Sequence, residues 1–185
     1  MDFHNLLENL KNQSFFSSLI IERGIEKESL RVTKNGYISN KKHPETLGSS
    51  YTNPSITTDF AESLIEIVTP TYISVDELYE KLKIIHIFIN QNLKDGEMLW
   101  PFSMPPKIED EAKINIATYG KTNMGRLKHV YRKGLAIRYG KTMQCVSGIH
   151  YNFSISDKSL KHLGYSSQNG TQDKISSYAC RGDTS

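Results

Sequence analysis

Residues 143–155, MQCVSGIHYNFSI, separate into an apolar and a polar set at alternate positions. The apolar set is Cys145, Ile149, Tyr151, Phe153 and Ile155, and the opposite set is Gln144, Val146, Gly148, His150, Asn152 and Ser154. Successive side chains of a β-strand point to opposite faces, so this period predicts one long strand with a packed apolar face. Amide and imidazole groups on the other face would suit the floor of a polar cavity. The alternative is a half-exposed strand whose polar face meets bulk water.

Two other segments are predicted to be strands. Residues 25–32 run into the turn Lys34-Asn35-Gly36, in which Asn-Gly is a strong hairpin signal. Residues 62–68 also alternate, and one face carries Glu62, Leu64, Glu66 and Val68. Thr69-Pro70 ends this strand, because proline cannot donate to a β-ladder.

Helices are predicted over residues 3–11, 75–95 and 124–138. The second is the clearest, because Ser74 is a good N-cap and Glu77 follows three positions later, which makes a capping box. Its apolar stripe has helical spacing and consists of Leu78, Leu82, Ile85 and Ile89. The tail, 166–185, is rich in small polar residues and is predicted to be disordered.

Composition excludes several classes of protein. The chain has 185 residues, which suits one ordinary domain or a small pair. A formal net charge of only +3 does not argue for nucleic acid or membrane partners. Cys145 and Cys180 form no CxxC pattern, so neither a disulfide framework nor a cysteine zinc site is expected. The start, MDFHNLLENL, is no signal peptide, and the most apolar run, 84–89, is too short for a bilayer, so a soluble cytoplasmic protein is predicted.

Closely spaced carboxylates are the first candidates for chemistry. Glu26 and Glu28 would point to the same face of a strand, about 6.5–7 Å apart along the backbone. Two such charges repel, so the pair must face water or hold a cation between its carboxylates. Asp59, Glu62 and Glu66 form a second acidic group, which is costly among apolar side chains unless it is paired or metal-bound. The alternative for both groups is a solvated surface.

An imidazole and a basic stretch add to these carboxylates. His150 could ligate a metal or pair with a carboxylate. Seven basic residues occur in 21 positions without Asp or Glu: Lys121, Arg126, Lys128, Arg132, Lys133, Arg138 and Lys141. This stretch would suit nucleotide phosphates or RNA, and the alternative is a solvated helix face, which is common. Neither a P-loop nor a Rossmann motif is present, and oxygen-rich ligation would favour Mg²⁺ or Mn²⁺ over zinc.

Six blocks of this sequence carry a resemblance to a known family. The blocks are RGIEKESLRV (23–32), HPETLGS (43–49), ITTDFAESLIEIVTP (56–70), MLWPFSMPP (98–106), YGKTNMGRLKHVYRKGLAIRYGKTMQ (119–144) and SGIHYNFS (147–154). In order and spacing they resemble the N-terminal part of the proteobacterial-type glutamate–cysteine ligase (γ-glutamylcysteine synthetase). Several long blocks in the right order make chance similarity an unconvincing explanation.

The resemblance implies both a fold and a reaction. The implied fold is α+β, with a mainly antiparallel sheet that forms part of a glutamine-synthetase-like active-site funnel and with flanking helices. In the implied reaction, ATP phosphorylates the γ-carboxylate of L-glutamate, and the amine of L-cysteine attacks the γ-glutamyl phosphate. Mg²⁺, or Mn²⁺ in its place, would bridge the phosphates and the γ-carboxylate. The implied partners are thus L-glutamate, L-cysteine and ATP, with neither nucleic acid nor membrane.

The same motifs carry over the expected site residues. Glu26, Glu28, Asp59, Glu66 and His150 match metal ligands of the family, and Glu26, Glu28 and His150 are also expected to be catalytic. The positions expected to bind substrate are Thr57, Thr58, Tyr131, Leu135, Gln144, Val146 and Asn152. The two threonines would lie near glutamate, and the other five would shape the cysteine pocket. Arg132 is expected to contact a phosphate of the nucleotide.

The chain departs from the family in its length. Family members are much longer, so residues 1–178 are expected to be the N-terminal portion of a catalytic domain. Residues 179–185 are expected to be a divergent, disordered tail after a frameshift or truncation. The resemblance implies that the missing part of the family sequence would supply another metal-binding carboxylate. Its loss would weaken metal binding and catalysis. The alternatives to a ligase are an inert fragment that at most binds metal or nucleotide, and an RNA-binding domain, against which the small net charge counts.

Overall fold

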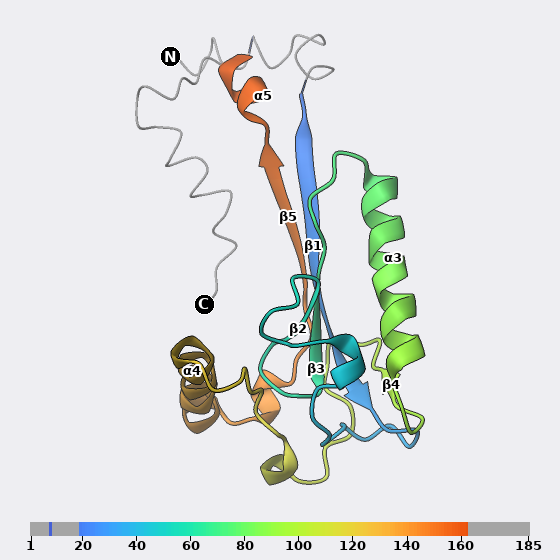
Figure 1. Cartoon of the computed structure of the whole chain (residues 1–185), viewed down its shortest axis with the longest axis vertical. Helices are drawn as coiled ribbons and strands as arrows, with labels where there is room; N and C mark the ends of the chain where they lie inside the picture. Colours follow the sequence, from blue (N-terminus) through green and yellow to red (C-terminus); the bar gives the residue numbers. More distant parts are fainter. Residues whose placement is uncertain (1–7, 9–18, 163–185) are drawn as a thin grey trace. The chain divides into compact units, whose positions relative to one another are not determined.

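The computed structural model describes residue 8 and residues 19–162 (Figure 1). Apart from Glu8, the predicted helix over 3–11 lies outside these residues, and so do the predicted tails 166–185 and 179–185. The chain divides into two compact units. The first comprises residues 1–24, 71–78 and 151–185, and the second comprises residues 25–70 and 79–150. The second unit contains every predicted site residue except Asn152.

The sheet is built from antiparallel pairs, as expected. Its strands are β1 (Ile21–Val32), β2 (Ile56–Thr58), β3 (Leu64–Val68), β4 (Met98–Leu99) and β5 (Ile149–Ile155). The order is β2-β3-β1-β4, and β5 also pairs with β1. β3 is antiparallel to both β1 and β2, and β4 is antiparallel to β1. The mixed α+β class with an antiparallel sheet is therefore confirmed.

The pairing of β1 with β3 decides which side chains share a face. Glu28 lies opposite Glu66 in this register. From the other side of β3, β2 brings Thr57 opposite Glu66. Because side chains alternate along a strand, these three side chains share one face of the sheet, and Ile65 and Ile67 belong to the other.

Each face of the sheet contributes to a separate apolar core. On the first, Ile65 and Ile67 pack with Ile85 and Ile89 of α3 (Val75–Asn92). The second core consists of Leu30, Phe60, Ala61, Leu64, Ile114 and Cys145, with Leu135 and Ala136 of α4 (Asn123–Tyr139) packed against it. Figure 1 shows α3 and α4 on opposite sides of the sheet. The Glu28–Glu66 pair therefore lies on the α4 side.

Side-chain caps begin both long helices. The Ser74 hydroxyl accepts a hydrogen bond from the Glu77 N–H at 3.3 Å, which confirms the predicted cap of α3. The Thr122 hydroxyl accepts from the Gly125 N–H at 3.1 Å and caps α4. α3 ends at Asn92, three residues before the predicted end, and α4 matches its prediction to within one residue at each end. Among the described residues, no helix is long and apolar enough to cross a bilayer.

The prediction of one strand over 143–155 is wrong in its first half. Thr142–Gln144 form a short 3₁₀ helix, and β5 begins only at Ile149. The Cys145 N–H donates back to the Thr142 carbonyl, and the Ser147 N–H donates to the Ser103 carbonyl. These N–H groups are therefore used in a turn and a loop contact, not in a β-ladder.

The predicted packed face of this segment is also wrong for its strand half. Cys145 is fully buried in the core. By contrast, Ile149, Tyr151 and Phe153 are 64%, 55% and 52% exposed. The alternation of apolar residues therefore continues through β5 without a packed layer against it in the described part of the chain.

The first unit is held by contacts between segments far apart in sequence. Arg23 and Tyr72 exchange backbone hydrogen bonds of 2.8 Å. The Ile20 N–H donates to the hydroxyl of Ser159, in the short helix α5 (Asp157–His162), at 2.9 Å. These bonds join the start of β1 to both other segments of this unit.

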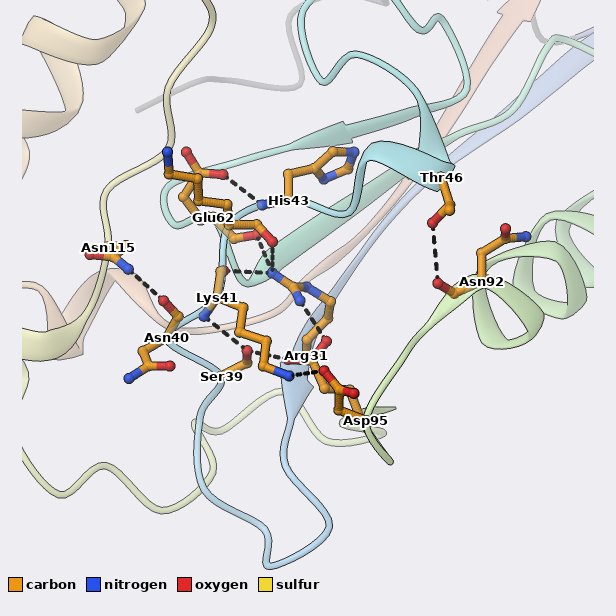
Figure 2. Close-up of polar contacts among 12 residues, drawn as sticks. Arg31, Ser39, Asn40, Lys41, His43, Thr46, Glu62, Asn92, Asp95 and Asn115 are labelled. Atoms are coloured by element: carbon orange, nitrogen blue, oxygen red, sulfur yellow. Dashed lines mark hydrogen bonds and ion pairs between the residues drawn. The ribbon is translucent and has the colours of Figure 1, made fainter.

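A buried arginine joins four segments of the second unit. Arg31 of β1 is fully buried and forms a 2.7 Å ion pair with Glu97. Its other terminal nitrogen donates to the carbonyl oxygens of Lys41, Lys42 and Glu62 at 2.8, 2.9 and 3.0 Å. Figure 2 shows Arg31 with Lys41 and Glu62. These bonds fix the loop after the first hairpin against the turn that precedes β3.

Glu62 lies in that turn and not in the predicted strand, because β3 begins at Leu64. Its carboxylate accepts from the His43 N–H at 2.8 Å, and from the N–H and the hydroxyl of Thr118 at 3.0 and 2.6 Å. Together with the bond from Arg31 to its carbonyl, four hydrogen bonds thus fix the position of Glu62. We infer a structural role for Glu62, since its acceptor oxygens already have partners.

Two glycines of α4 should respond oppositely to alanine. A Cβ on Gly125 would lie 2.2 Å from the Tyr119 carbonyl oxygen, whereas a Cβ on Gly134 would meet nothing within 4 Å. Gly125→Ala should therefore lower the free energy of unfolding by about 1–3 kcal/mol. Gly134→Ala should raise it by about 0.5–1 kcal/mol through helix propensity. Urea unfolding followed by circular dichroism measures both, and equal effects of the same sign would contradict the close packing at Gly125.

Candidate metal and substrate site

Four carboxylates gather on and beside the α4-facing side of the sheet. Glu26 and Glu28 lie two residues apart on β1 and so share a face. Glu66 lies directly opposite Glu28. Asp59 follows β2 in the turn that leads to β3. Three separate segments of the second unit therefore supply the acidic side chains.

The backbone of Gly148 connects Glu28 to His150. The Gly148 N–H donates to the Glu28 carboxylate at 2.8 Å, and the Glu28 N–H donates to the Gly148 carbonyl at 3.0 Å. Two residues on, the His150 Nδ1 lies 3.4 Å from a carboxylate oxygen of Glu26. The start of β5 thus brings the imidazole beside the E-x-E pair.

The carboxylates carry charge that nothing nearby fully neutralises. Burial raises the pKa of Glu66 to about 7, and the negative charges of Asp59, Glu28 and Glu26 act in the same direction. Burial likewise raises the pKa of Glu28, although the bond from Gly148 works against this. A carboxyl pKa raised in this way marks a site where a proton or a cation is welcome.

Asp59 is joined to α4 through Arg132. The Arg132 Nε donates to the Asp59 carbonyl oxygen at 2.5 Å, and a terminal nitrogen lies 3.6 Å from the Asp59 carboxylate. The guanidinium also stacks 4.7 Å from the centre of the Tyr119 ring. Arg132 therefore lies at the edge of the acidic group, as a positive charge beside the expected ligands.

The donor set suits a hard divalent cation, although the side chains do not yet converge. Among the described residues, no three His, Cys, Asp or Glu side chains lie close enough together to hold a metal ion. The oxygen ligands nevertheless match the preference of Mg²⁺, and the raised pKa values of Glu28 and Glu66 show charge that a cation would offset. Glu26, Glu28, Asp59, Glu66 and His150 are the residues that could hold it.

Comparison with known proteins identifies the family. The sequence profile of the glutamate–cysteine ligase family matches residues 5–180 of the chain. The chain belongs to this family. A glutamate–cysteine ligase of Hahella chejuensis is 49% identical over 151 residues, which cover 82% of this chain and 29% of the relative. The chain thus spans about 30% of the length of relatives such as this one and that of Shewanella pealeana.

Two solved structures are similar to this fold. A glutamate–cysteine ligase from Francisella tularensis, in complex with AMP, matches with a TM-score of 0.76 and 39% identity. The match covers 85% of this chain and 30% of that one. A bifunctional glutathione synthetase from Pasteurella multocida matches with a TM-score of 0.72 and 34% identity, over 90% of this chain and 20% of that one.

The two threonines expected near glutamate in a glutamate–cysteine ligase take opposite faces. Thr57 lies opposite Glu66 and so shares the face with the carboxylates. Its hydroxyl donates to the Ser50 carbonyl at 2.5 Å. Thr58 lies opposite Ile65 and is buried, and its hydroxyl has no partner among the described residues. Of the two threonines, only Thr57 therefore lies on the face of the sheet that carries the carboxylates.

The positions expected to shape the cysteine pocket are spread over several elements. Tyr131 is exposed on α4, and Leu135 lies partly buried on the same helix against the core. Gln144 ends the short 3₁₀ helix, and Val146 is exposed in the loop that follows. Asn152 is an exposed residue of β5 in the first unit. The second unit alone therefore supplies four of these five positions.

The basic stretch is largely used within the chain. The Lys128 ammonium lies 5.1 Å from the centre of the Tyr119 ring, and Arg132 stacks on the same ring. The Lys141 ammonium donates to the carbonyl oxygens of Ala112 and Ile114 at 3.1 and 2.8 Å. The Arg138 guanidinium lies 5.8 Å from the centre of the Tyr139 ring, so four of the seven cations contact other groups of the chain.

Sequence reasoning missed two residues that contact the candidate ligands. Gly148 and Tyr119 touch Glu28 and the Asp59 backbone, respectively. Both occur inside the quoted family blocks, but nothing in their residue types points to these contacts. Their roles come from pairings between segments about 60 and 120 positions apart, which no local pattern encodes.

Proposed function

We propose that this chain carries the metal-binding face of a glutamate–cysteine ligase. Glu26, Glu28, Asp59, Glu66 and His150 are the proposed ligands of Mg²⁺. The observation that supports this best is the direct cross-strand pair of Glu28 and Glu66, both with a raised pKa. Two carboxylates opposite each other destabilise a sheet, so their presence points to a bound cation as the functional state.

The proposal extends to the reaction of the family. In it, ATP phosphorylates the γ-carboxylate of L-glutamate, and the amine of L-cysteine displaces the phosphate to form the amide. Bound Mg²⁺ would offset the negative charge of the phosphates and of the γ-carboxylate. The AMP complex of the Francisella tularensis relative supports a nucleotide as one substrate.

Different residues would contribute separately to binding the metal and the substrates. Glu28 is oriented by the Gly148 N–H, so its free oxygen keeps a fixed direction. His150 is exposed beside Glu26 and can turn to contribute a ring nitrogen. Arg132 keeps one terminal nitrogen near Asp59, where it adds positive charge at the rim of the site. Thr57 lies beside Glu66, in reach of a substrate on that face.

Mg²⁺ binding by the 185-residue chain tests the proposal directly. Glu28→Gln should raise the dissociation constant, measured by calorimetry, by more than about tenfold, because even outer partners of ligands cost about 10- to 100-fold. Glu22→Gln is the matched control, since Glu22 is an exposed residue of the same strand. Equal binding by all three proteins would contradict the assignment.

The alternative function is a chain that binds metal or nucleotide without ligation. It is favoured by one observation, that the chain spans about 30% of the length of its relatives. ADP release with ATP, Mg²⁺ and glutamate separates the two. A cysteine-dependent signal that Glu26→Gln abolishes would establish ligation, and its absence from a folded chain that binds Mg²⁺ would establish the alternative.

A further inference from the structure

We propose that Tyr119 is a positioning residue that fixes the direction of the Asp59 carboxylate and thereby selects a small divalent cation. The inference rests on the proposed function, because Asp59 is one of the proposed ligands. Tyr119 is not itself a proposed ligand, because its hydroxyl donates to backbone carbonyl oxygens. It acts through the backbone on which Asp59 is carried.

The hydroxyl of Tyr119 holds the backbone on both sides of Asp59. It lies 2.7 Å from the Thr58 carbonyl oxygen and 2.8 Å from the Asp59 carbonyl oxygen, and its one proton is shared between them. The first carbonyl belongs to the peptide group before the Asp59 Cα, and the second belongs to the group after it. Peptide groups are planar, so holding both planes fixes φ and ψ of Asp59 and the direction of its Cα–Cβ bond.

Other bonds hold the same turn from different directions. The Asp59 N–H donates to the Leu64 carbonyl at 3.1 Å, which closes the turn. The Arg132 Nε donates to the Asp59 carbonyl oxygen at 2.5 Å. The Ala117 N–H donates to the Phe60 carbonyl at 2.9 Å. Tyr119 is the one of these groups that contacts both peptide planes of Asp59.

Tyr119 is itself held firmly enough to act in this way. Its side chain is buried, with 2% of the residue exposed, and Arg132 and Lys128 lie over its ring. Its backbone packs against Gly125 so closely that a Cβ there would lie 2.2 Å from the Tyr119 carbonyl oxygen.

The Asp59 side chain has little else to orient it. It is 42% exposed, and within the described part of the chain its carboxylate meets an Arg132 nitrogen only at 3.6 Å. The direction set by the backbone therefore decides where the carboxylate can reach. Mg²⁺ demands near-ideal octahedral geometry, whereas Ca²⁺ accepts six to eight ligands in flexible arrangements. A loosened Asp59 should therefore cost Mg²⁺ more than Ca²⁺.

The test compares Mg²⁺ and Ca²⁺ binding by the full chain and by Tyr119→Phe, each with the metal chloride alone in a calorimeter. Phenylalanine keeps the ring and its cation contacts and removes only the hydroxyl. The dissociation constant for Mg²⁺ should rise by about tenfold, and that for Ca²⁺ should rise much less. Tyr139→Phe makes the same change at a residue that is 54% exposed and should alter neither constant.

A second variant covers the case in which Tyr119→Phe fails to fold by circular dichroism. Arg132→Lys keeps the positive charge but removes the Nε donor to the Asp59 carbonyl, so it should shift the ratio of the two constants in the same direction. An equal loss for both ions, or no loss, would overturn the role of Tyr119. If the unmodified chain binds no Mg²⁺, the proposed function fails first and takes this inference with it.

Discussion

Replacing Glu97 with alanine should lower the free energy of unfolding by about 3–5 kcal/mol, because it leaves the charge of a buried arginine without its counter-charge. The Arg31–Glu97 pair has 1% and 4% of its side chains exposed and an N–O distance of 2.7 Å. Urea unfolding of the 185-residue chain gives the change directly. Glu97 also accepts from the Ser39 hydroxyl, so that hydroxyl loses its partner as well.

The size of this effect follows from how little water reaches the pair. A guanidinium that remains buried cannot recover its hydration when Glu97 is truncated. Its other partners are the backbone carbonyl oxygens of Lys41, Lys42 and Glu62, which are uncharged groups. The same carbonyls tie the arginine to the turn before β3. Loss of the pair should therefore loosen the turn that carries Asp59 as well as lower global stability.

An exposed ion pair close by provides the control. The Lys41 Nζ lies 2.5 Å from an Asp95 carboxylate oxygen, and about half or more of each side chain is exposed. Figure 2 shows this pair. Asp95→Asn removes the charge and suits the positive φ of 57° at this position. It should leave the unfolding midpoint almost unchanged. A loss for Glu97→Ala no larger than for Asp95→Asn would show that water reaches Arg31.

Glu66→Gln should change how the stability of the metal-free chain depends on pH. Burial and neighbouring carboxylates raise the pKa of Glu66 from 4.5 to about 7 in the folded chain. Raising a pKa by one costs about 1.4 kcal/mol, so the full effect is roughly 3 kcal/mol at most, since solvent still reaches this half-buried side chain.

The sign follows from which state holds the proton. Below pH 4.5 both the folded and the unfolded chain carry it, and Glu66 costs nothing. Between pH 4.5 and about 7 the unfolded state releases the proton while the folded state keeps it, so stability falls as pH rises. Above about 7 the loss is complete. Glutamine cannot ionise, so the variant should lose less stability between pH 5 and 8.

Thermal unfolding of both proteins at several pH values measures this difference. Glu80→Gln, at an exposed residue of α3, should reproduce the unmodified profile. Mg²⁺ at pH 8 should stabilise the unmodified chain and have less effect on Glu66→Gln, because a ligand stabilises the state that binds it. A flat profile for the unmodified chain between pH 5 and 8 would contradict the raised pKa.

Much of the fold could be predicted because local signals and tertiary packing agree. The Ser74 cap and the stripe of Leu78, Leu82, Ile85 and Ile89 indicated α3, and the alternation after Ser63 indicated β3. The segment 143–148 failed because an alternating pattern also arises in a turn and a loop. Cys145 is apolar there because it fills the core, not because it belongs to a strand.

The candidate site could be predicted in part. The pattern Glu26-Lys27-Glu28 indicated a pair that must face water or hold a cation, and the pairing of β1 with β3 adds Glu66 as a third carboxylate. That pairing joins positions 38 apart, so no local window reveals it. The faces of Thr57 and Thr58 likewise follow from the register of β2 on β3. The sequence did not predict the hydrogen bonds from Gly148 to the Glu28 carboxylate and from Tyr119 to the Asp59 carbonyl.

The cross-strand pair of Glu28 and Glu66 also bears on how the chain folds. Both residues must find each other across an intervening loop before any site exists, and such non-local contacts form slowly. A slip by one residue would send Glu66 to the face occupied by the α3 core, so a misregistered sheet would bury a charge and lack one of the proposed ligands. In the observed register the Glu28 and Glu66 carboxylates repel each other, yet only this register places both on the same face of the sheet. The proposed cation site would therefore form only when β1 and β3 pair in the observed register.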